Sequence, residues 1–180
     1  MGDLIWYVSQ SDLTAKLATA MAALQIGISQ ARTDEDIAAV AKLFREYADS
    51  IGVDLEYQGF SAELAVLPGL YAPPTGDLLL ARLNGEAAGC VALRALDQST
   101  LEMKRLYVRP AIRGTGLGKR LVESAISVAR RSGYMELRLD TLATMAAAQR
   151  LYQAFGFVEI PAYGKAYLPG TRFYTLHLAV

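Results

Sequence analysis

Three strand patterns follow one another without an intervening helix between Asp77 and Val108, and this run limits the folds that are open to the chain. The first two, in DLLLARLNGEAAGCVALRAL, meet at Asn84-Gly85, a dipeptide typical of tight turns in β-hairpins. The third pattern, STLEMKRLYV, follows after a short polar segment. Consecutive strands with short connections tend to pair as neighbours, so we expect an antiparallel meander at the centre of the fold.

Helix patterns lie on both sides of the meander. Residues 33–52 (TDEDIAAVAKLFREYADSIG) begin with capping residues, carry one apolar face and end at a glycine, and a strand pattern (IGISQAR) precedes them. Downstream, a helix from Leu117 to about Gly133 is followed by a strand (YMELRLDTL), a helix (ATMAAAQRLYQAFG) and a final alternating strand (TRFYTLHLAV). This order predicts a mixed α/β (α+β) fold around one central sheet.

Composition narrows the kind of protein. The chain has 18 basic and 18 acidic residues, so no overall field attracts nucleic acid or a membrane surface. A length of 180 residues fits one main domain, and Cys90, the only cysteine, cannot form an intrachain disulfide. We therefore expect a cytoplasmic protein. His177 is the only histidine, which leaves too few nitrogen and sulfur ligands for a zinc site, and we expect no metal.

The first 25 residues are predicted to form a helical extension, because apolar residues recur at helical spacing behind Ser11 and Asp12. The uncharged stretch LATAMAALQIGISQA contains Thr, Gln and Ser and is too polar for a membrane span. Asp3 and Asp12 stand where a secretory signal would carry basic residues. We expect the functional domain to occupy residues 26–180.

Three glycines at alternate positions, in RGTGLGKR, separate the third meander strand from the next helix. A P-loop is excluded, since Arg113 stands five positions before Gly118 and Arg120 follows Lys119. A dinucleotide-binding loop fits poorly, because Lys119 occupies the place of its third glycine. The pattern that fits is R-x-x-G-x-G, in which glycines and the free amides of a helix start bind an anion such as pyrophosphate. A tight strand-to-helix turn without a ligand is the alternative.

Four features together resemble the GNAT superfamily of N-acetyltransferases, over about residues 26–180. They are the LYVRP strand end, the RGTGLG loop, the AQRLYQAFGF helix with its following strand, and the order of elements. The resemblance implies a central mixed, mostly antiparallel sheet with helices on both faces. It also implies acetyl-CoA as co-substrate and transfer of acetyl to a primary amine of a small molecule or peptide.

The resemblance assigns cofactor contacts to two segments. Backbone amides of the glycine loop would hold the pyrophosphate of CoA. The preceding strand would be splayed from its neighbour and pair with the pantetheine arm as an added strand would. A backbone N–H at or near Leu106 would polarise the thioester carbonyl. The cofactor residues are therefore Leu106, Tyr107, Val108, Arg113, Gly114, Thr115, Gly116, Leu117, Gly118 and Lys119.

Glu102 and Tyr152 are the predicted catalytic residues. An alkyl amine must lose a proton before it attacks, and Glu102 stands where relatives with a glutamate base carry theirs. Its apolar neighbours Leu101 and Met103 favour a carboxyl group that accepts protons. The alternative is a strand glutamate that faces solvent or pairs with Lys104 or Arg105. Tyr152 matches a tyrosine that protonates or hydrogen-bonds the departing thiolate, and its alternative is a core aromatic residue.

Other residues are expected to be structural, or are open. Met145 stands where relatives commonly carry an Asn, so that contact cannot be assigned; His177 and Cys90 are expected to be structural. Five tyrosines are predicted either to shape the acceptor pocket or to lie on an amphipathic surface: Tyr57, Tyr71, Tyr163, Tyr167 and Tyr174. A CoA-binding module without catalysis and an acyltransferase using a longer acyl-CoA remain alternatives. The apolar C-terminal strand and the N-terminal extension favour a homodimer.

Overall fold

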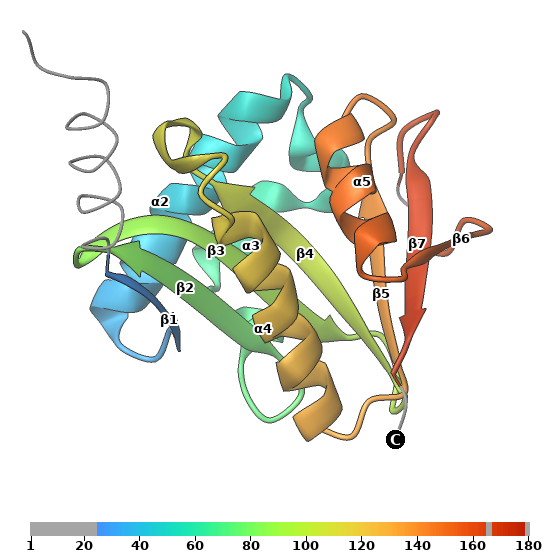
Figure 1. The fold of residues 1–180 in the computed structure, drawn as a ribbon, viewed down its shortest axis with the longest axis horizontal. Helices are drawn as coiled ribbons and strands as arrows, with labels where there is room; N and C mark the ends of the chain where they lie inside the picture. The colour runs from blue at the N-terminus through green and yellow to red at the C-terminus, as the bar shows by residue number, and fades with distance from the viewer. Residues whose placement is uncertain (1–24, 165–166, 179–180) are drawn as a thin grey trace, which may run out of the picture.

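The protein is described here by a computed structural model, which covers residues 25–164 and 167–178. Its strands form one seven-stranded sheet in the order β1-β2-β3-β4-β5-β7-β6 (Figure 1). Only β4 and β5 are parallel neighbours, and every other adjacent pair is antiparallel. The strands are β1 Ile26–Gln30, β2 Asp77–Leu83, β3 Glu86–Ala95, β4 Thr100–Val108, β5 Glu136–Thr141, β6 Val158–Ile160 and β7 Arg172–His177.

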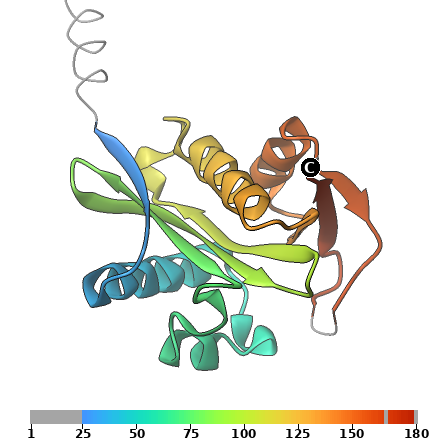
Figure 2. The same cartoon turned by 90° about the horizontal axis from the view of Figure 1, so that it is seen from below.

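Helices cover both faces of this sheet, as Figure 2 shows from below. One face packs against α2 and α3, and the opposite face packs against α4 and α5. The helices are α2 Asp34–Ile51, α3 Phe60–Ala65, α4 Leu117–Arg131 and α5 Ala146–Ala154, with short 3-10 turns η1 Leu55–Gln58, η2 Gly69–Tyr71 and η3 Pro110–Ile112. The predicted fold class is confirmed. The helix expected over the first 25 residues lies almost entirely outside the described residues.

Local sequence signals explain where elements begin and turn. The β2–β3 turn places Asn84 and Gly85 at positive φ, 51° and 87°, as the primed hairpin turns require. Helix α2 begins with a capping box in which Thr33 accepts from the Asp36 amide while Asp36 accepts from the Thr33 amide. Such caps contribute about 1 kcal/mol of stability. Both elements were predicted from the sequence, and both form as predicted.

The sheet divides between β4 and β5. These two strands pair only where Thr100 to Glu102 lie beside Glu136 to Arg138, and no pairing beyond Glu102 is found in the part of the chain that the structure describes. The later half of β4 therefore leaves its β5-side backbone groups without a strand partner. Because the two strands diverge, an opening forms through the sheet at this point.

The C-terminal strand β7 lies inside the sheet, paired with both β5 and β6. Its apolar side chains Tyr174 and Leu176 pack within the core of this domain. The prediction of a homodimer drew partly on this strand, which is already used within one chain. Among the described helices, none combines the length and apolar character that a membrane crossing needs.

Candidate active site

Three cavities meet where β4 and β5 diverge. An outer groove of about 720 Å³ lies between the end of α2, the end of β4, the glycine loop and the start of α5. A central cavity of about 30 Å³ shares Leu106 and Met145 with that groove. A far cavity of about 220 Å³ shares Lys104, Arg105 and Asp140 with the central cavity. The three cavities thus follow one path through the opening in the sheet.

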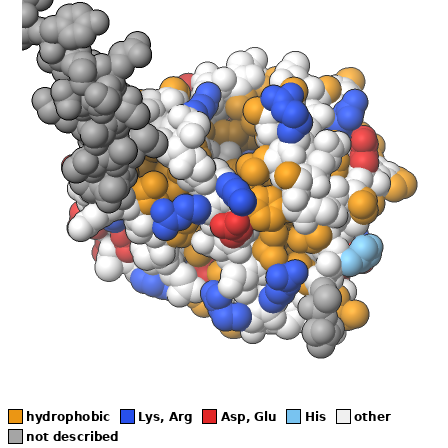
Figure 3. Space-filling view, viewed as in Figure 1, with side chains coloured by type: hydrophobic (Ala, Val, Ile, Leu, Met, Phe, Trp, Pro, Cys, Tyr) orange, Lys and Arg blue, Asp and Glu red, His pale blue; other side chains and the backbone are white. Residues whose placement is uncertain are grey.

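Figure 3 shows the outer groove as a hollow with apolar side chains in its floor and basic side chains at its margin. Of the ten predicted cofactor residues, nine line this groove: Leu106, Tyr107, Val108, Arg113, Gly114, Gly116, Leu117, Gly118 and Lys119. The structure therefore brings together two segments that the sequence predicted to act on one ligand. Thr115 is the exception, because its hydroxyl donates to the Ile112 carbonyl and its amide points to the same oxygen at 3.4 Å.

Helix α4 begins in this groove without a capping side chain. Gly116 is its N-cap at φ 83°, and Gly114 has φ 84°, a region that side chains with a Cβ disfavour. Within the described residues, no acceptor is found for the amides of Gly114, Gly116, Leu117, Gly118 and Lys119. These amides and the positive end of the helix dipole together form a site suited to an anion.

Arg113 closes one side of the groove. Its Nε donates to the Val108 carbonyl oxygen at 3.1 Å, and its guanidinium lies over the Tyr107 ring at 5.9 Å. The Val108 carbonyl thus accepts a hydrogen bond from Arg113, whereas the sequence predicted that it would bond the pantetheine arm. Arg109, one residue after β4, fixes the strand end by bonding both carboxylate oxygens of Glu46.

A β-bulge in β4 interrupts the pairing with β3 beside the central cavity. Cys90 pairs with Tyr107 and Ala92 with Lys104, so Arg105 and Leu106 together lie opposite the single residue Val91. Arg105 adopts φ 56°, which is unusual for a residue with a Cβ. Bulges redirect backbone and side chains, and this one lies at the residue for which the sequence predicted a carbonyl-polarising N–H.

Tyr152, on α5, lines the central cavity together with Leu106. The residue is 6% exposed, and its ring packs against Phe157 and Tyr174. Tyr152 is therefore a core aromatic residue that also borders the cavity, and its role toward the thiolate stays a prediction. Burial raises the pKa of Tyr152 above the usual value of a tyrosine, so the hydroxyl stays protonated at neutral pH.

Glu102 lines the far cavity and is 3% exposed. Its Oε2 accepts from Arg94 Nε at 2.7 Å across the β3–β4 pair. The sequence argument from apolar neighbours is wrong, because Leu101 and Met103 belong to the core on the opposite face of the sheet. The surroundings of Glu102 are charged. Its strand position was predicted correctly, but its partner is neither Lys104 nor Arg105.

The sequence interpretation missed the other charged groups of the path. Lys104 Nζ lies 2.7 Å from Asp140 Oδ1, bridging the two diverging strands. Arg105 donates to both oxygens of Glu63 and to Gln58, which fixes the α3 segment over the bulge. A polar residue alternating with Leu137 and Leu139 on β5 was the only available signal for Asp140. The contacts of Lys104 and Arg105 depend on how segments distant in the sequence come together, which the sequence does not display.

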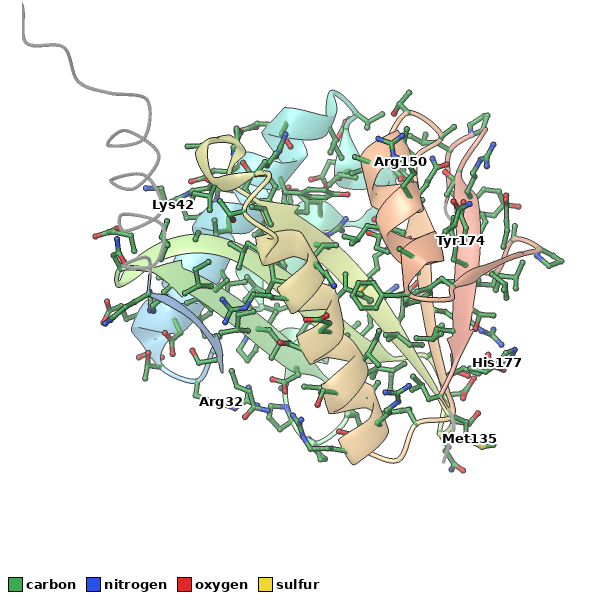
Figure 4. All side chains as sticks on the ribbon, in the orientation of Figure 1. Arg32, Lys42, Met135, Arg150, Tyr174 and His177 are labelled. Atoms are coloured by element: carbon green, nitrogen blue, oxygen red, sulfur yellow. The ribbon has the colours of Figure 1, made fainter. Side chains whose placement is uncertain are left out.

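The remaining residues separate into those near the path and those away from it. Of the five tyrosines, Tyr57 lines the central cavity and Tyr163 the far cavity, whereas Tyr71, Tyr167 and Tyr174 line none of the three. His177 lies at the end of the sheet remote from the start of α4, near Glu136 (Figure 4). Met145 precedes α5 without a side-chain cap, and Gln149 instead holds the preceding loop by bonding the Leu142 and Ala143 carbonyls.

Cys90 is fully buried within β3, and burial raises the pKa of its thiol far above the usual value. We expect the native protein to react with a thiol reagent such as DTNB at less than a hundredth of the rate of the urea-unfolded chain. Absorbance at 412 nm would measure both rates. Rapid labelling of the folded protein would mean that β3 opens readily.

The fold is shared with solved acetyltransferases. A putative acetyltransferase from Salmonella typhimurium, solved with its cofactor acetyl-CoA, has a TM-score of 0.66 and 23% identity over 86% of this chain and 94% of its own. The chain belongs to the acetyltransferase (GNAT) family, whose model matches residues 37–157. The resemblance stated from the sequence is confirmed.

Two curated relatives extend this comparison. An uncharacterized N-acetyltransferase of Schizosaccharomyces pombe is 38% identical over 156 residues, which cover 86% of this chain and 96% of the relative. The N-acetylaspartate synthetase of Homo sapiens is 34% identical over 119 residues, which cover 65% of this chain and 38% of that protein.

Proposed function

We propose that this protein transfers the acetyl group of acetyl-CoA to a primary amine of a small molecule or peptide. The observation that carries the proposal is the continuous path from the outer groove, through the opening between β4 and β5, to the far cavity. A cofactor held at the start of α4 would present its acyl end at Leu106 and Tyr152. An acceptor in the far cavity would meet it there.

In this proposal the glycine loop binds the pyrophosphate, and the unpaired edge of β4 binds the pantetheine arm. The Leu106 amide, placed beside the bulge, stabilises the oxyanion that forms when the amine attacks the thioester. Glu102 accepts the proton that the ammonium form of the acceptor must lose, directly or through water. The Tyr152 hydroxyl donates to the departing sulfur.

The size of the central cavity favours acetyl over a longer acyl group. Its volume of about 30 Å³ is on the scale of one or two water molecules, which makes it the smallest of the three cavities, and a longer chain would have to occupy the far cavity that the acceptor needs. The charged far cavity beyond it favours an enzyme over a module that only binds CoA, because such a module needs no second cavity. The name N-acetylaspartate synthetase, carried by one relative, supports a small-molecule acceptor.

A single assay tests the function. The purified chain is incubated with acetyl-CoA and a panel of primary amines, including amino acids, polyamines and short peptides, and free CoA is followed with DTNB. Because Cys90 is buried, the signal reports the cofactor thiol. Amine-dependent CoA release, with the acetylated amine identified by mass, supports the proposal. CoA binding without acetylation of any amine would instead favour the binding module.

Glu102→Gln tests the proton acceptor. The amide oxygen can still accept from Arg94 Nε, so the fold and the affinity for acetyl-CoA should be preserved. We expect kcat at neutral pH to fall about 100-fold, the lower end of the usual range, because water can take over the proton. The pH–rate profile should flatten with it.

Glu136→Gln is the matched control, since Glu136 lies on the neighbouring strand β5 but lines none of the three cavities. It should retain parental turnover. Parental turnover of Glu102→Gln across the pH range would assign the base to water or another group.

A further inference from the structure

The far cavity contains three basic side chains, each with an acidic neighbour, and their remaining hydrogen-bonding capacity differs. Arg105 uses Nε and Nη2 on Glu63 and Nη1 on Gln58. Lys104 forms its ion pair with Asp140 at 2.7 Å. Arg105 is therefore committed to protein partners, and it also contacts the Phe60 ring. Within the described residues Lys104 keeps two of its three ammonium donors, but it also lines the central cavity, nearer the acyl end of the path.

Arg94 is different. Only its Nε is bonded, to Glu102 Oε2 at 2.7 Å, and within residues 25–164 and 167–178 no acceptor is found for Nη1 or Nη2. The side chain is 32% exposed and lines the far cavity. Glu102 therefore fixes the guanidinium plane while its terminal nitrogens remain available to another group.

A second unpaired donor lies in the same cavity. The Tyr163 hydroxyl is buried in the wall of the far cavity, where it lies near the Glu102 carboxylate but forms no hydrogen bond of normal geometry within the described residues. Glu102 influences both donors, since burial first and the Glu102 charge second raise the pKa of the Tyr163 hydroxyl. Because this hydroxyl faces the cavity, it can donate to an oxygen atom of a ligand bound there.

The free donors match a carboxylate. An arginine fork and one hydroxyl supply planar, charge-assisted bonds to two oxygens, which is the geometry that a carboxylate accepts. A phosphate monoester would bring close to two negative charges beside Glu102. The cavity volume of about 220 Å³ suits a small molecule of amino-acid size.

We propose that Arg94, oriented by Glu102 and assisted by Tyr163, binds a carboxylate of the acceptor, so that the acceptor is a small amine that also carries a carboxylate, such as an amino acid. The proposal rests on the proposed function. Arg94 lines only the far cavity, whereas Lys104 and Asp140 line both the far and the central cavity. The acceptor would thus direct its amine toward the central cavity and the acetyl group, its carboxylate would lie at Arg94, and the ammonium proton would reach Glu102 through water.

Matched acceptors test the proposal. The twenty L-amino acids, their carboxamides and their decarboxylated amines are compared by kcat/KM with saturating acetyl-CoA. The acids should exceed their amides at least tenfold. In Arg94→Lys, which keeps the charge beside Glu102 but loses the fork, the acid-to-amide ratio should fall about tenfold or more, toward one, mainly through KM. Tyr163→Phe should reduce the acid-to-amide ratio less. Arg172 is an exposed arginine on β7, and Arg172→Gln, the control, should leave the ratio unchanged.

A binding measurement makes the proposal independent of turnover. N-acetyl amino acids and the corresponding N-acetyl amines are titrated into the CoA-saturated protein by calorimetry. The carboxylated products should bind more tightly, and Arg94→Lys should remove the difference. Equal binding, or equal kcat/KM for acids and amides, would overturn the carboxylate site while acetylation of amines still supported the proposed function. Failure of every amine to be acetylated, with carboxylate binding retained, would overturn the function instead.

Discussion

Gly116→Asp should abolish the stabilisation of the protein by acetyl-CoA. At a hundredfold excess over its dissociation constant, a ligand of the native state stabilises by about 2.7 kcal/mol, which a thermal melt detects as a shift of several degrees. Gly116 is the N-cap of α4 and lines the groove, and a Cβ built there meets no atom within 4 Å, so an Asp side chain has room beside the anion site. Its carboxylate would occupy the anion site and repel the pyrophosphate.

Gly133→Asp controls for the backbone strain that any side chain causes at a positive φ. Gly133 has φ 79°, close to the 83° of Gly116, and its Cβ also meets no atom, but it lies after the C-terminal end of α4 and outside the groove. Gly133→Asp should therefore show a similar loss of intrinsic stability while keeping the full acetyl-CoA shift. An unchanged shift in Gly116→Asp would place the cofactor elsewhere.

Tyr152→Phe should lower kcat about 100-fold, the smaller end of the range for general acids, because a thiolate is already a fair leaving group. KM for acetyl-CoA should change little, since the ring and its contacts with Phe157 and Tyr174 remain. The raised pKa of Tyr152 keeps the phenol protonated, so we expect the parental enzyme to show no loss of rate from its ionisation up to about pH 10.

Tyr174→Phe is the control for removing a buried hydroxyl from the same aromatic cluster. The Tyr174 hydroxyl is buried and has no partner among the described residues, and Tyr174 lines none of the three cavities. This variant should keep parental turnover and lose no stability. If Tyr152→Phe retains turnover but melts at a lower temperature, its hydroxyl is a structural donor and the acid role is wrong.

The sequence by itself determined the local features of this protein. The Asn84-Gly85 turn, the capping box of Thr33 and the uncapped glycine start of α4 each depend on residues within a few positions of one another. Their conformations follow from backbone sterics and short-range hydrogen bonds, which a sequence displays directly. The same locality explains why nine of the ten predicted cofactor residues line one groove, since they belong to one strand, loop and helix start.

Only the tertiary structure decided the charged part of the site. The partner of Glu102 depends on the register of β3 against β4, which places Arg94 opposite it. The alternation of polar and apolar residues along β4 does not fix that register until it is known which face of the sheet each residue occupies. Lys104 and Asp140 come together because β4 and β5 are parallel neighbours that then diverge, although 36 positions separate them. The bulge at Arg105 is held by Glu63 and Gln58 from a distant segment, and no local pattern specifies it. Ion pairs between distant strands are set by packing, so their partners appear only when the sheet has formed.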